Sequence, residues 1–172
     1  VFYMLAHGLS SAALFLVLGF LADRRGSADV SAFGGVQKVA PVLAGFFLVA
    51  GMATLSLPGL ANFVGEFLAM AGAWSAYPAH TAVITLGMVL AAAYVLTVYL
   101  RTMTGPVTEQ TAEHVKYDLG IREKLVVSPL LILLLVFGFF PKPILQAADD
   151  AATHAMTVIG ATDQAPQIEE SN

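Results

Sequence analysis

A carboxylate stands in the middle of an apolar stretch of this 172-residue chain. Glu66 lies in the string GLANFVGEFL, residues 59–68, and the nearest basic residues along the sequence are Lys38 and Arg101. An ionised side chain near the centre of a bilayer costs about 3 kcal/mol or more, so such residues usually face a cavity, a partner or a proton path. Glu66 therefore indicates proton or ion exchange. The alternative is a protonated or hydrogen-bonded carboxyl that only holds helices together.

His7 is the second candidate for proton chemistry, because imidazole changes charge near neutral pH and can pass a proton through either ring nitrogen. Its alternative role is a neutral side chain bonded to a backbone carbonyl or to Ser10 or Ser11, which makes both serines candidate supporting groups. Lys38 could feed protons toward the acid from the cytoplasmic side. A lysine at the boundary of a span, however, commonly extends its ammonium group toward water.

Other kinds of chemistry lack the residues they need. The chain contains no cysteine, which excludes disulfides and cysteine-ligated iron–sulfur clusters. None of the four histidines is three or four residues from another, so no helical metal motif is predicted. The net charge is −4, without a basic run, and we expect no nucleic-acid partner. We predict no catalytic residue and no metal site in this chain.

The composition is that of a membrane protein. Hydrophobic residues make up 58% of the chain and charged residues only 12%, whereas a soluble domain carries roughly a quarter charged residues. We predict an all-α, polytopic transmembrane helix bundle. The chain opens inside an apolar run, without a basic n-region or a cleavage site, so we expect the C-terminal membrane part of a longer chain over residues 1–160. Residues 161–172 are acidic, and a disordered tail is predicted there.

The apolar segments predict the order of the spans. Three continuous spans and one short interfacial helix are expected, at about residues 1–22, 82–103, 122–140 and 144–159 respectively. Pro129 leaves two possibilities for the last span, a short helix that begins at Ser128 or a longer helix that is kinked. We favour the kinked helix.

Loop charge indicates that residues 41–76 form one discontinuous span, broken at Pro58-Gly59. With one span, seven of the eight Lys and Arg residues fall on one side and only Lys142 on the other; with two spans they split four and four. The positive-inside rule prefers the first arrangement. A break exposes backbone groups that buried protein or water must satisfy, and transporters place ion sites there. Glu66 follows this break by seven residues.

Two strings carry a family resemblance. HGLSSAALFLVLGFLADR (7–24) followed by LSLPGLANFVGEFLAMAGAW (55–74), with the ending FGFFPKPIL (137–145), resembles the C-terminal third of the antiporter-like, M-type subunits of bacterial respiratory NADH–quinone oxidoreductase, complex I. The resemblance implies inverted repeats of five helices, each repeat with a discontinuous helix. Glu66 and His7 match ionisable groups of the family's hydrated line at mid-membrane. Related L- and N-type subunits typically carry lysine where this chain has Glu66, which favours the M type.

The resemblance also implies a function. It implies a proton-translocating membrane-arm subunit in the bacterial inner membrane, surrounded by lipid, with L- and N-type neighbours and its C-terminal tail on the non-cytoplasmic side. This chain would hold no cofactor, since FMN, iron–sulfur clusters, NADH and quinone would bind to other subunits of the enzyme. Two alternatives remain open. One is a subunit of a multisubunit sodium/proton antiporter, and the other is a purely structural membrane-arm subunit.

Overall fold

The computed structural model describes residues 1–160, which contain helices and connecting segments but no strand. The helices are α1 (Phe2–Arg25), η1 (Val30–Ala32), α2 (Val36–Val39), α3 (Pro41–Thr54), α4 (Ala61–Ala76), α5 (Pro78–Met103), α6 (Glu109–His114), α7 (Ile121–Phe139) and α8 (Lys142–Ile159). The predicted all-α fold class is therefore confirmed. The acidic tail predicted at 161–172, and the membrane side predicted for it, lie outside the described residues.

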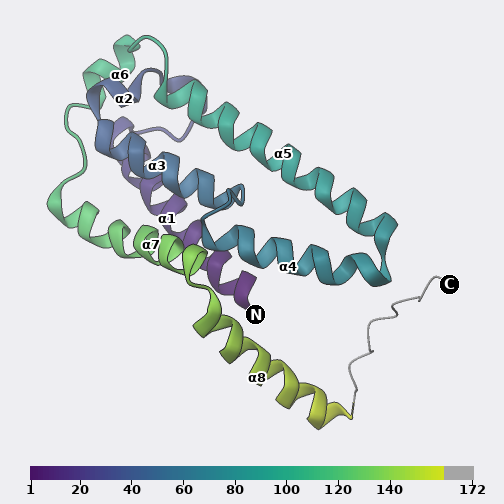
Figure 1. Cartoon of the computed structure of the whole chain (residues 1–172). Coiled ribbons are helices and arrows are strands. Elements are labelled where there is room, and N and C mark those ends of the chain that lie inside the picture. The colour runs from purple at the N-terminus through teal and green to yellow at the C-terminus, as the bar shows by residue number, and fades with distance from the viewer. Residues whose placement is uncertain (161–172) are drawn as a thin grey trace.

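Helix α1 is the central helix of the bundle and packs against α3, α4 and α7. The helices α3 and α4 follow one another roughly in line, and the single long helix α5 runs back alongside both of them (Figure 1). The pair α3 and α4 thus covers the length that α5 covers alone. The pair therefore corresponds in position to the discontinuous span predicted at residues 41–76.

The break between α3 and α4 has a defined backbone structure. Helix α3 ends in a Schellman motif, in which the N–H of Leu57 donates to the carbonyl of Met52 and that of Ser56 donates to Ala53, both at 3.0 Å. Ser56 holds the left-handed position of this motif, at φ 61°. Pro58 then prevents the helix from continuing, and Leu60 precedes the first turn of α4.

Helix α7 covers the break from another side. A Cβ atom at Gly138 would collide with the backbone carbonyl of Gly59, so only glycine permits this approach. Helix α7 begins at Ile121 and passes through Pro129 without interruption. Of the two possibilities left by the sequence, the structure therefore has the longer helix.

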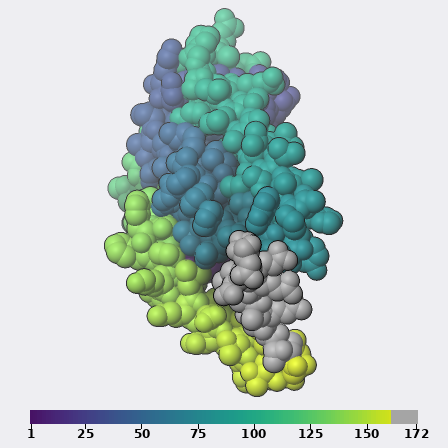
Figure 2. Space-filling view, turned by 45° about the vertical axis from the view of Figure 1, so that its right-hand side comes forward, coloured from purple at the N-terminus to yellow at the C-terminus, as the bar shows by residue number. Residues whose placement is uncertain are grey.

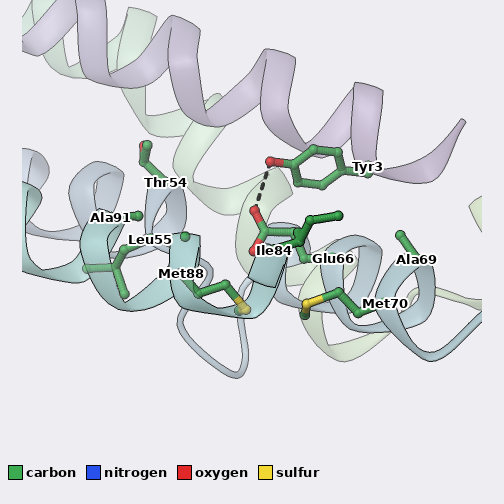
Figure 3. Close-up of a pocket in the computed structure, with 10 residues that line it drawn as sticks. Tyr3, Thr54, Leu55, Glu66, Ala69, Met70, Ile84, Met88 and Ala91 are labelled. Carbon is green, nitrogen blue, oxygen red and sulfur yellow. Dashed lines mark hydrogen bonds between the residues drawn. The ribbon is translucent and has the colours of Figure 1, made fainter. Parts of the chain in front are cut away.

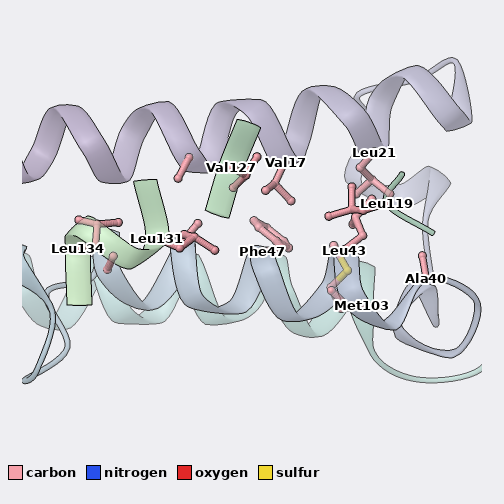
Figure 4. Packing of buried hydrophobic residues seen from close by; sticks show 14 of the residues in the cluster. Val17, Leu21, Ala40, Leu43, Phe47, Met103, Leu119, Val127, Leu131 and Leu134 are labelled. Atoms are coloured by element: carbon pink, nitrogen blue, oxygen red, sulfur yellow. The ribbon is translucent and has the colours of Figure 1, made fainter. Parts of the chain in front are cut away.

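The core lies where α1, α3 and α7 meet. Val17, Phe47 and Leu131 point into it from these three helices (Figure 4). Helix α5, by contrast, is exposed along most of its length, although many of its exposed side chains are large and apolar: Val83, Ile84, Leu86, Val89, Leu90, Tyr94, Leu96 and Leu100. Such a surface is typical of contact with lipid or with another subunit.

Within residues 1–160, two helices, α1 and α5, are each long and apolar enough to cross a membrane. Helices α7 and α8 meet this criterion only when taken together, and they are bent by 78° at their junction. Helix α8 extends from the lower end of the bundle and has no buried residue (Figure 2).

A buried arginine ties the loops together at the end of the bundle where α2 and α6 lie. Arg24 forms an ion pair with Glu123 at 2.6 Å and donates hydrogen bonds to the backbone carbonyls of Phe20 and Tyr117. The carboxylate of Asp118, in the same loop, accepts hydrogen bonds from two backbone N–H groups in the first turn of α3, at 2.8 and 2.9 Å. The loop before α7 therefore caps the N-terminus of the broken helix.

Candidate functional site

Glu66 lies on α4 just after the break, and its side chain is half-buried. Its Oε1 atom accepts a hydrogen bond of 2.8 Å from the hydroxyl of Tyr3 on α1 (Figure 3). Both residues line a cavity of about 310 Å³ between α1, the end of α3, α4 and α5. The other lining residues are mostly apolar: Thr54, Leu55, Ala69, Met70, Ile84, Gly87, Met88 and Ala91. Few polar groups therefore offset the charge of the carboxylate.

Gly65 allows Tyr3 to come this close. A Cβ atom at Gly65 would lie 2.8 Å from the Cα and from the Cβ of Tyr3, closer than real side-chain atoms approach. The small-residue series Gly65, Ala69 and Ala73 is typical of close helix contacts in membranes. Gly65, the first residue of this series, lets the backbone of α1 pack directly on α4. This contact brings the hydroxyl of Tyr3 within hydrogen-bond distance of Glu66.

His7 lies one turn along α1 from Tyr3 and is exposed. Its ring centroid is 5.6 Å from that of Tyr3, with 35° between the ring planes. Its Nε2 atom is 3.2 Å from the hydroxyl oxygen of Ser11. Tyr3 therefore contacts both residues, His7 through its ring and Glu66 through its hydroxyl, while no hydrogen bond joins His7 to Glu66 within residues 1–160.

Ser10 links the same two helices at a second point. It is fully buried, donates to the carbonyl of His7 at 3.1 Å, and accepts a hydrogen bond of 2.9 Å from the amide of Asn62. Asn62 is also fully buried, and its Oδ1 atom has no hydrogen-bond partner among the described residues. The buried hydroxyl of Ser56 at the break is in the same situation. Polar atoms thus concentrate where the helix is interrupted.

Lys38 is not part of this group. It is exposed on α2, at the opposite end of α3 from the break. Within residues 1–160, no group of three or more His, Asp or Glu side chains is placed to hold a metal ion.

The sequence reasoning missed Tyr3 and Asn62. Tyr3 precedes His7 by four residues, and Asn62 precedes Glu66 by four, so each shares a helix face with a residue that was singled out. A search for polar side chains one turn away from each candidate would have found both. Of the two serines, Ser11 contacts the ring of His7 and Ser10 only its backbone carbonyl, and their support of proton transfer stays a prediction.

Known proteins resemble this chain over most of its length. The family described as NADH:quinone oxidoreductase/Mrp antiporter, TM, matches residues 1–92, which include Tyr3, His7, Asn62 and Glu66. The NADH-quinone oxidoreductase subunit M of Mycobacterium tuberculosis (strain ATCC 25618 / H37Rv) is 52% identical over 166 residues, 96% of this chain and 30% of the relative.

Two further relatives have the same name. That of Escherichia coli (strain K12) is 38% identical over 154 residues, 88% of this chain and 30% of the relative. That of Rickettsia felis (strain ATCC VR-1525 / URRWXCal2) is 37% identical over 146 residues, 85% of this chain and 29% of the relative. The chain thus spans about 30% of the length of these curated relatives. These matches confirm the resemblance seen in the sequence, and the chain belongs to the NADH:quinone oxidoreductase/Mrp antiporter family of transmembrane proteins.

Proposed function

We propose that this chain is part of an M-type, proton-translocating membrane-arm subunit of a respiratory NADH–quinone oxidoreductase. The observation that carries the proposal is the position of Glu66, which stands after the break between α3 and α4 in a largely apolar cavity. The names of the relatives support the enzyme.

The site suits the exchange of protons. A carboxyl group in apolar surroundings responds strongly to an approaching cation or water molecule, because few other groups offset its charge. Glu66 is the group that binds and releases the proton, while His7 is a neighbouring group on the same route. The redox reaction, with NADH, FMN, iron–sulfur clusters and quinone, takes place in other subunits. The neighbours of this subunit are of the L and N types, in a bacterial inner membrane.

A subunit of a multisubunit sodium/proton antiporter is the second candidate, since the description of the matching family also names an Mrp antiporter. The names of the relatives favour the oxidoreductase. The antiporter requires sodium-dependent transport without NADH oxidation. A third candidate, a purely structural subunit, requires that the titratable proton of Glu66 has no effect on transport.

The test is the Glu66→Gln variant of the full-length subunit, measured in sealed membrane vesicles. Glutamine keeps the size of the side chain and removes its titratable proton. We expect equal assembly of the complex and loss of most NADH-driven proton pumping. Glu113→Gln, an exposed residue of α6, is the matched control and should pump as the wild type does. Unchanged pumping in Glu66→Gln would reject proton exchange at this residue.

A further inference from the structure

We propose that Tyr3 is a positioning residue for Glu66, whose hydroxyl holds the carboxyl on the α1 side of the cavity so that proton exchange takes place there. This inference rests on the proposed function. It assigns a role to a residue that the sequence reasoning missed.

The hydrogen bond between the two side chains has good geometry. The distance of 2.8 Å from the Tyr3 hydroxyl to Oε1 of Glu66 is the usual length for an O–H···O bond. A phenol can donate to the ionised carboxylate and can also donate to the carbonyl oxygen of the protonated acid. The bond therefore persists in both protonation states, as a positioning contact requires.

The surrounding contacts fix the phenol in place. The backbone and Cβ of Tyr3 pack on Gly65, and the ring of Tyr3 lies next to that of His7. The hydrogen bond from Asn62 to Ser10 joins α4 to α1 at a second point. Residue 3 of α1 bonds to residue 66 of α4, and residue 10 bonds to residue 62, so the two helices run antiparallel. Neither helix can slide along the other without breaking one of these two hydrogen bonds.

Other groups around the cavity cannot replace Tyr3. Helix α5 faces the carboxyl with Ile84, Gly87, Met88 and Ala91, and α4 adds Ala69 and Met70. The end of α3 contributes Thr54, whose hydroxyl already donates to the carbonyl of Ala50 at 2.9 Å. The titratable groups on the α1 side are Tyr3 and His7, and the ring nitrogen of His7 that makes a bond contacts Ser11. Tyr94 of α5 also lies near Tyr3, but it is exposed and does not line the cavity. Without the phenol, the carboxyl is free to rotate toward the apolar side of the cavity.

The test is Tyr3→Phe in the full-length subunit of the assembled complex. Phenylalanine keeps the ring and the contact with Gly65, so only the hydroxyl is lost. We expect a several-fold fall in protons pumped per NADH oxidised, at equal assembly. Tyr99→Phe is the matched control, because the ring of Tyr99 packs on Phe47, away from this cavity. This control should pump as the wild type does.

Infrared difference spectra between acidic and neutral pH report on the Glu66 carboxyl itself. A general loss of stability would not change the wavenumber of its C=O band. The C=O band of the protonated Glu66 is the band that Glu66→Gln removes. In Tyr3→Phe it should shift to higher wavenumber, because the hydrogen bond that weakens the C=O bond is gone. In Tyr99→Phe it should stay in place.

The outcomes separate the two proposals. If Glu66→Gln abolishes pumping while Tyr3→Phe pumps normally, the inference is wrong and the proposed function stands, whether or not the C=O band shifts. If Tyr3→Phe pumps poorly with an unshifted band, the inference is also wrong, because the hydroxyl then acts elsewhere. If Glu66→Gln pumps normally, both proposals are wrong. Only a shifted band together with impaired pumping supports the role of Tyr3.

Discussion

Gly65 determines how closely α1 approaches α4, and with that whether Tyr3 reaches Glu66. The glycine is buried, and the Cα of Tyr3 occupies the space that a side chain would need. Gly72, two turns later on the same helix, has no atom within 4 Å of the equivalent point. The two glycines therefore differ in packing although both stand in the interior of one helix.

This difference predicts opposite results for two alanine substitutions. Gly65→Ala should weaken the contact between α1 and α4 by about 1–3 kcal/mol, the usual cost of overpacking, and should impair proton pumping by displacing Tyr3. Gly72→Ala should be neutral or slightly stabilising, because alanine favours the helix. Hydrogen–deuterium exchange of residues 61–76 measures the stability of α4 in both variants, and we expect faster exchange in Gly65→Ala only. Equal exchange in the two variants would mean that this close contact does not stabilise the two helices.

At the residue scale, the sequence indicates the polar residues that are rare in apolar spans. Glu66 and His7 were found in this way. Tyr3 was not, because a tyrosine in a membrane helix most often serves only packing. Its role depends on a hydrogen bond between residues that are 63 positions apart, and only the packing of α1 on α4 creates it.

At the scale of helices, the sequence predicted a break at Pro58-Gly59, and this pair lies in the non-helical segment 55–60. Helix α3, however, ends before the pair, at Thr54. The residue that turns the chain into the left-handed conformation is Ser56 rather than a glycine. Serine rarely takes this conformation, because its Cβ makes it unfavourable by about 1–2 kcal/mol. No local rule would therefore have placed the end of α3 there.

The cap that Asp118 provides for α3 leads to a prediction at this scale. Asp118→Asn keeps the size of the side chain but loses its charge and one acceptor oxygen. The first turn of α3 should then be destabilised by about 0.5–2 kcal/mol, the usual range for a lost cap. Hydrogen exchange at residues 42–45 should rise accordingly, while Glu113→Gln, at an exposed position of α6, should leave it unchanged. If exchange does not change in Asp118→Asn, the carboxylate does not stabilise the start of α3.

At the scale of the whole molecule, the basic residues gather at one end. The end of α1, α2, the end of α5, α6 and the start of α7 lie together (Figure 1). With the segment between α6 and α7, which holds Lys116, they carry all the Lys and Arg residues except Lys142. The start of α8, which holds Lys142, lies at the other end of α7. Loop charge was sufficient to predict this arrangement. The side on which each loop lies depends on the number of membrane spans before it and not on how the helices pack. The sharp bend between α7 and α8 could not be derived from charge.

Membrane topology can be tested with single cysteines, since the chain has none of its own. We predict that Asp150→Cys on α8 reacts with a membrane-impermeant maleimide from the periplasmic side. Glu113→Cys on α6 should react only in inverted vesicles, from the cytoplasmic side. Both residues are exposed in the structure. The reverse pattern, with Glu113→Cys labelled from outside and Asp150→Cys only from the cytoplasmic side, would contradict a single discontinuous span, because two full spans within residues 41–76 would exchange the sides of both positions.

The interruption between α3 and α4 also has an electrostatic consequence. Each helix carries a macrodipole, with about half a positive charge at its N-terminus and half a negative charge at its C-terminus. The negative end of α3 and the positive end of α4 therefore face each other inside the bundle, next to the buried Ser56 and Asn62. An uninterrupted helix would carry these partial charges only at its two ends. The break thus places a pair of opposite partial charges, made entirely of backbone, one to two turns of α4 from the carboxyl that we propose exchanges protons.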